Sequence, residues 1–146
     1  MKRLTREWIK KAEADFQSVQ RELRARKHPN LDGACFHAQQ CIEKYLKARL
    51  QEVSIRFDRT HDLCALVQQL SEIEPTWLLL EPALRPLSAY AVVFRYPGRT
   101  ATKSEASEAI KHASHVRELA RATLRLAAKS RLRAKRSPAK RSSRGK

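Results

Sequence analysis

The chain has 146 residues, with 31 Lys and Arg against 15 Asp and Glu, and carries a formal net charge of +16. This length allows one domain and a tail but not two full-sized domains, and 3 Gly and 6 Pro are too few for the turns of a β-sandwich or barrel. The 3 Cys include no Cys-x-x-Cys pair and no apolar run approaches roughly 18 residues, so we expect a cytoplasmic protein with no disulfide framework, metal, cofactor or membrane span.

The first two helices are predicted from apolar residues that recur at steps of three and four. The first such pattern begins at Thr5 and ends near Lys27, before a His-Pro-Asn sequence. Asn30 or Asp32 can cap a second helix, which should reach about Glu52. Its predicted inward face consists of Cys35, Ala38, Ile42, Tyr45, Leu46 and Leu50.

The middle of the chain predicts shorter pieces. Thr60 is the expected cap of a third, short helix. Pro75 suits the first turn of a short helical segment, and Pro82 suits the start of a longer helix with a kink or irregular start at Pro86. Tyr96-Pro97-Gly98 should end that helix, because the residue before proline disfavours the helical region and glycine opens the turn.

A last helix is predicted from the capping-box pattern Thr102-Lys103-Ser104-Glu105. Counted together, the segments predict an all-α protein, an up-and-down bundle of four to five helices joined by short loops. We assign residues 1–128 to this bundle and residues 129–146 to a disordered basic tail.

The tail explains most of the excess charge. Residues 125–146 hold ten Lys and Arg and no Asp or Glu, interspersed from Lys129 onward with Ser, Pro and Gly. Few apolar side chains are present to offset the entropy of ordering such a segment. It should bind nucleic acid through phosphate contacts and counterion release, or serve only as a solubilising tail.

Two groups of residues could bind phosphate. His37, Gln40, Lys44 and Lys47 follow one another at steps of three and four, so they share one stripe of the second helix. The stripe could receive a phosphate, although a lone histidine beside a core face is often an interior residue and the lysines could be ordinary solvated charges.

The second group surrounds the Tyr-Pro-Gly break. Arg95 and Arg99 flank Tyr96, and a guanidinium is the preferred side chain for phosphate, while the tyrosine ring could stack on a base. An arginine at a helix end can also do no more than complement the terminal carbonyls.

Four motifs in order resemble the HEPN domain family (higher eukaryotes and prokaryotes nucleotide-binding). They are W-x3-A-x2-D-F from Trp8, C-F-H-A-Q-Q-C-I-E-K-Y-L-K-A from Cys35, T-H-D-L from Thr60 and Y-x4-R-Y-P from Tyr90. The resemblance covers roughly residues 5–125. It implies a helical bundle that forms a homodimer and acts with a minimal nucleotidyltransferase in a two-component, toxin-antitoxin-like module. It also makes Tyr96 a candidate for adenylylation by that partner.

Nuclease members of the family carry R-x(4-6)-H, and the resemblance assigns its arginine to Arg95. The positions for the histidine hold Thr100, Ala101 and Thr102. Arg56 and His61 have the motif's spacing but lie in a loop, and the last helix adds two further histidines, His112 and His115.

Metal-free RNA cleavage needs a group that exchanges a proton near neutral pH, whereas arginine mainly stabilises the phosphate. We therefore expect a nucleotide- or RNA-binding protein rather than an enzyme. One alternative is a metal-independent ribonuclease toxin that uses Arg95 with a displaced histidine. Another is a non-catalytic interaction module whose tail alone binds nucleic acid.

Overall fold

The structure is a computed structural model that describes residues 1–125. The tail predicted at residues 129–146 lies outside the described residues. Eight helical segments follow one another along the described chain, five α-helical and three 3-10, with no strand among them. They are α1 (Arg3–Arg24), α2 (Leu31–Glu52), α3 (Leu63–Leu70), η1 (Pro75–Leu80), α4 (Glu81–Leu84), η2 (Ser88–Ala91), η3 (Val93–Arg95) and α5 (Lys103–Thr123). The predicted all-α bundle is confirmed.

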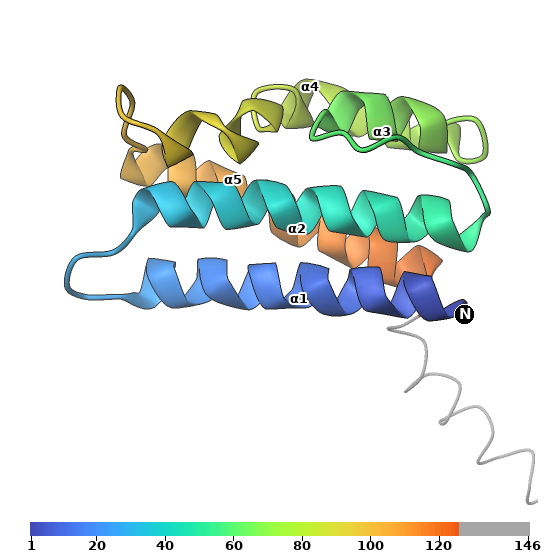
Figure 1. The fold of residues 1–146 in the computed structure, drawn as a ribbon, viewed down its shortest axis with the longest axis horizontal. Helices are drawn as coiled ribbons and strands as arrows, with labels where there is room; N and C mark the ends of the chain where they lie inside the picture. Colours follow the sequence, from blue (N-terminus) through green and yellow to red (C-terminus); the bar gives the residue numbers. More distant parts are fainter. Residues whose placement is uncertain (126–146) are drawn as a thin grey trace, which may run out of the picture.

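Helix α2 is the central element of the bundle (Figure 1). It runs antiparallel beside α1, and α3 and α5 also pack on it. The Asn30 side chain accepts a hydrogen bond from the backbone N–H of Gly33 at 2.8 Å, which confirms one of the two predicted caps. Because α2 has neighbours on several sides, polar residues on it can be buried as well as apolar ones.

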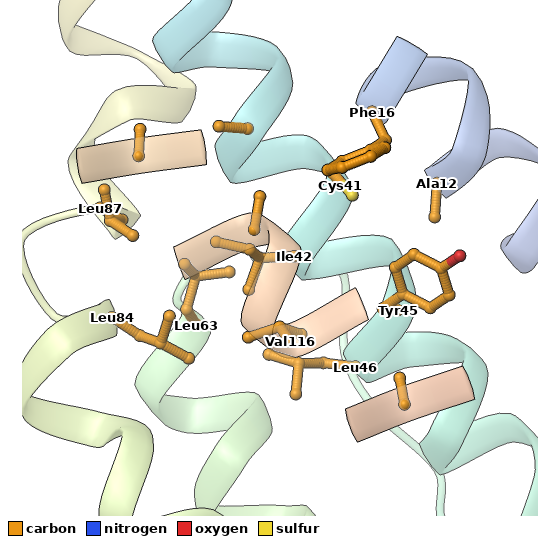
Figure 2. Packing of buried hydrophobic residues seen from close by; sticks show 14 of the residues in the cluster. Ala12, Phe16, Cys41, Ile42, Tyr45, Leu46, Leu63, Leu84, Leu87 and Val116 are labelled. Carbon is orange, nitrogen blue, oxygen red and sulfur yellow. The ribbon is translucent and has the colours of Figure 1, made fainter. Parts of the chain in front are cut away.

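The hydrophobic core lies between α1, α2, α3 and α5 and is closed by the segment that contains η1 and α4. Figure 2 shows Ile42 and Leu46 of α2 among Leu63, Leu84 and Val116. All six residues predicted for the inward face of α2 are buried. Burial of a Leu or Ile side chain contributes about 1.5–3 kcal/mol, so this face accounts for much of the stability of the bundle.

The segment between α3 and α5 differs from the prediction. The longer helix expected after Pro82 does not form: α4 ends at Leu84, and two 3-10 turns follow. Pro86 is the physical reason, because its ring lacks an N–H and clashes with the carbonyl four residues earlier. The predicted stop is confirmed, since Tyr96 is extended and Gly98 has a φ of 119°.

Two helix caps were predicted downstream of α2. The prediction of Thr60 as the cap of α3 is wrong: the Asp62 carboxylate accepts from the Cys64 and Ala65 amides, and the Thr60 hydroxyl accepts from the Asp62 amide. The capping box of α5 is confirmed, with Thr102 and Glu105 each accepting a hydrogen bond from the other's backbone N–H.

The three cysteines are unpaired and buried. Burial raises the pKa of the Cys35 thiol to about 12 and also raises the pKa of Cys41 and Cys64. None of the described helices is long and apolar enough to span a membrane.

Candidate phosphate-binding site

Arg95 ends η3 and lies against α2. Its guanidinium carbon is 5.2 Å from the centre of the Phe36 ring, a cation–π contact, and the residue is exposed. Within residues 1–125 the guanidinium has no carboxylate partner. An arginine that is positioned by a ring and not neutralised by an acid keeps its donors available for an anion.

The two other residues of this group lie in different surroundings. The Tyr96 side chain is 61% exposed, so its ring and hydroxyl are accessible from solvent. The Arg99 guanidinium pairs with Glu105 at 2.5 Å and lies over the Phe94 ring. Arg99 is therefore partly neutralised within the protein, whereas Arg95 is not.

The residues of the α2 stripe bond to two different buried carboxylates. The first is Asp15 of α1, which contacts His37 and Lys44. One oxygen of this carboxylate is 2.7 Å from His37 Nδ1, and the other accepts from Lys44 Nζ at 2.6 Å. The Asp15 side chain is 10% exposed, against 35% for His37. Sequence reasoning placed the histidine and the lysine together but missed the acid that links them.

The second carboxylate is Glu43, which lies on α2 itself and is almost completely buried. It accepts from Lys47 Nζ at 3.1 Å and from Gln39 Nε2 at 3.2 Å, and it is 2.7 Å from His61 Nδ1. Gln40 donates to the side-chain oxygen of Gln39 at 2.7 Å. Lys47 is thus a buried, paired cation, and phosphate binding by the four stripe residues stays a prediction.

Arg95 and His37 meet at one aromatic ring. The His37 imidazole lies edge-on to Phe36, with ring centres 5.2 Å apart, and Arg95 lies over the same Phe36 ring. Because Asp15 occupies Nδ1, the free ring nitrogen of His37 is Nε2. A guanidinium and an oriented imidazole therefore share one end of the bundle.

Two of the positions where the motif's histidine would stand form hydrogen bonds that fix the backbone instead. The Ala101 amide donates to the Asp32 carboxylate at 2.6 Å, and Thr102 is the cap of α5. His61, which follows Arg56 at the motif spacing, is held by Glu43, and His112 of α5 pairs with Glu108. The site of the missing histidine is thus occupied by residues that join the loop to α2 and begin α5.

A third ionic cluster ties α1 to α5. The Arg117 guanidinium donates to both oxygens of Glu13 at 2.7 Å, and the Tyr45 hydroxyl donates to the same carboxylate at 2.6 Å. Burial alone would raise the pKa of Glu13, but the bonds from Arg117 and Tyr45 outweigh it and the pKa is lowered. Burial together with the bond to Glu13 raises the pKa of the Tyr45 phenol. The Glu13 carboxylate thus receives bonds from α2 and α5, so this cluster links three helices of the bundle.

Within residues 1–125 no group of three or more His, Cys, Asp or Glu side chains is placed to hold a metal ion. The arrangement can bind an anion at Arg95 and presents one oriented imidazole, that of His37, against the same Phe36 ring.

The fold and these residues define an all-α bundle with an exposed arginine and an aspartate-held histidine at one end. The family model of the HEPN domain matches residues 5–123, and the chain belongs to this family. It is also 30% identical over 129 residues to the protein named "Putative toxin MJ1304" of Methanocaldococcus jannaschii. The aligned region covers 77% of this chain and 82% of that relative. No solved structure matches the chain.

Proposed function

We propose that this HEPN protein is the toxin-like component of a two-component module and binds nucleotide or RNA phosphates at the end of the bundle that Arg95 marks. The observation that carries the proposal is the state of Arg95, which is exposed, held on Phe36 and without a carboxylate partner among the described residues. The toxin-like role is supported by the similarity to the M. jannaschii protein.

The partner is a minimal nucleotidyltransferase, and a homodimer is the working unit. Tyr96 is the proposed site of nucleotidylation, because a modified hydroxyl must reach the active site of another protein and this side chain is 61% exposed. Incubation of the chain with that partner and ATP should add one nucleotide, detected by mass spectrometry. Modification that persists in Tyr96→Phe would contradict this assignment.

Calorimetric titration with ATP and GTP tests the phosphate site, using the full chain and a chain that ends at residue 128. Arg95→Ala should weaken binding about tenfold, which corresponds to about 1.4 kcal/mol. Arg85→Ala is the matched control, because Arg85 is also exposed but is paired with Glu81. Equal affinity in the two variants would contradict the proposal.

The same titrations examine the interaction module with a nucleic-acid-binding tail. That alternative requires all affinity for RNA or nucleotide to disappear when residues 129–146 are removed. Binding that survives in the shortened chain and still depends on Arg95 contradicts it.

A metal-independent ribonuclease is the second candidate function, and one observation favours it. In this candidate the displaced histidine is His37, whose Nδ1 is bonded to Asp15 and whose ring contacts the Phe36 ring that Arg95 also contacts. His37 would take the proton from the ribose 2′-hydroxyl, whose oxygen would bond to phosphorus as the P–O5′ bond breaks to leave a 2′,3′-cyclic phosphate. The protonated imidazole would return the proton to the leaving 5′-oxygen, and Arg95 would stabilise the charge on the phosphate.

The nuclease candidate is tested with labelled single-stranded RNA in the presence of EDTA. Cleavage should be lost in His37→Gln and in Arg95→Ala but kept in His115→Gln, which changes an exposed histidine of α5. Growth arrest on expression should follow the same pattern. No cleavage by the unaltered chain, or equal cleavage by all variants, would exclude this candidate.

A further inference from the structure

A pocket at the other end of α2 contains none of the residues of the Arg95 group. It has a volume of about 480 Å³ and lies between the N-terminal half of α1, the C-terminal end of α2 and the connector to α3. Figure 1 shows these three segments at one end of the bundle. Lys47 follows Phe36 by 11 residues on α2, so the two side chains start about 16 Å apart along the helix axis.

Two aromatic rings form a corner of the pocket. Trp8 of α1 and Phe57 of the connector meet with ring centres 6.0 Å apart and planes at 64°. This geometry leaves no gap for intercalation between the rings. A planar group can instead stack on one ring while its edge meets the other, a contact worth about 1–3 kcal/mol for a nucleobase.

The pocket is also positively charged. Lys47 Nζ lies 5.4 Å from the centre of the Trp8 ring and 5.9 Å from that of Phe57, and it is neutralised by Glu43. Glu7 at the rim pairs with Arg3.

The remaining charged side chains of the rim are the exposed cations Lys11 and Arg59 and the carboxylate of Asp58. One positive charge is therefore in excess. Lys11 follows Trp8 by three residues on α1 and Arg59 follows Phe57 by two in the connector, so both cations line the pocket together with the two rings.

We infer that this pocket binds a nucleoside monophosphate, with the base on the Trp8–Phe57 corner and the phosphate at Lys11 and Arg59. An aromatic corner beside exposed cations suits a ligand that combines a planar ring with a phosphate. The pocket volume lies within the range of small-molecule sites, about 300–1,000 Å³. The inference rests on the proposed function for its ligand class, but it uses a different part of the molecule.

Trp8 supplies a direct readout for the test. Titration of the full chain with AMP should quench tryptophan fluorescence in a saturable way. Trp8→Phe should lose the quenching but keep AMP binding by calorimetry, because a stacking ring remains. The second tryptophan, Trp77, is buried and lies outside this pocket, so it should not respond.

Exposed cations can be changed with little risk to folding. The double variant Lys11→Ala, Arg59→Ala should weaken AMP binding at least tenfold, while Lys10→Ala, a neighbouring exposed lysine outside the pocket, should leave it unchanged. Phe57→Leu should also weaken it. Adenosine and ribose 5-phosphate should each bind at least tenfold more weakly than AMP, since each lacks one half of the ligand.

Absence of quenching, equal binding of ribose 5-phosphate and AMP, or unchanged affinity in the double variant would overturn the inference. Arg95→Ala should leave the quenching of Trp8 fluorescence by AMP intact. Loss of that quenching in Arg95→Ala would overturn the inference that the pocket is separate from the Arg95 site. If the Trp8 signal persists while Arg95→Ala has no effect on ATP, GTP or RNA, the site at Arg95 fails and the pocket stands. If Arg95→Ala alone weakens nucleotide binding, the pocket fails and the proposed function stands.

Discussion

Lys47 and Arg49 at one end of α2 and Arg95 at the other lie in opposite electrostatic environments. At the C-terminal end Lys47 is buried and paired with Glu43, and Arg49 is buried and paired with Glu74. At the N-terminal end Arg95 lies over the Phe36 ring, exposed and without a carboxylate among the described residues. The difference shows that a basic residue serves stability or binding according to the acid that another part of the chain brings to it.

The largest effect on this comparison is expected from Glu43→Ala. Removal of this buried carboxylate leaves Lys47 without a partner, and breaking a buried pair in this way costs about 3–5 kcal/mol. Urea unfolding measures the change. Glu72→Ala, at an exposed acid, should stay within about 0.5 kcal/mol, and a similar small loss at Glu43 would show that the pair is not important for stability.

The next effect is acid destabilisation. The pKa values of Glu13, Glu52 and Glu105 are lowered in the folded chain, the first chiefly by bonds from Arg117 and Tyr45 and the other two by backbone bonds from Lys2 and Thr102. A lowered pKa stabilises the fold above the unfolded value, and that contribution is lost as the pH falls through the folded value.

The free energy of unfolding should therefore decrease as the pH falls below about 4.5, the ordinary value for these groups. Denaturant titrations between pH 7 and pH 3 follow this decrease. The slope should be shallower in Glu13→Gln, because that variant lacks one of the three carboxyls. An identical slope in both proteins would show that Glu13 has no lowered pKa.

A smaller effect is expected from Thr102→Ala. The change removes the side-chain acceptor at the start of α5 and should lower stability by about 0.5–2 kcal/mol in thermal or urea unfolding. Thr102→Ser keeps the acceptor and serves as the control. Equal losses in both variants would point to packing of the threonine methyl group rather than to capping.

The smallest effect on stability is expected from Arg95→Ala. The residue is exposed and makes one cation–π contact, so the free energy of unfolding should change by no more than about 0.5 kcal/mol. Arg49→Ala, at the buried and paired arginine of α2, should be much more destabilising. Similar losses in the two variants would remove the contrast between the ends of α2.

Much of the fold follows from local sequence patterns. The periodicity of α1 and α2, the Asn30 cap and the Thr102–Glu105 capping box each depend on residues within a few positions of one another, and the structure confirms them. The longer helix after Pro82 failed for a local reason as well, since Pro86 interrupts the backbone bonds too early.

The site was less predictable because its partners are distant in sequence. Asp15 is 22 residues from His37 and 29 from Lys44, and no spacing rule connects them. Asp15 follows the core residue Ala12 by three positions and precedes Val19 by four, so helical spacing put it on the buried face of α1. This was one signal, since a buried acid needs a partner. The burial of Lys47 could not be predicted from the polar stripe for a different reason. Other elements cover α2 on several sides, so a polar residue on this helix need not be exposed.

The low reactivity of the three buried cysteines permits selective labelling of an introduced cysteine. A maleimide reacts with a thiolate, and thiols with a raised pKa inside the core supply almost none at neutral pH. A cysteine introduced at Leu79, whose side chain is 81% exposed, would therefore label selectively in the native chain. Fluorophores or spin probes could then report association between subunits without prior removal of Cys35, Cys41 or Cys64.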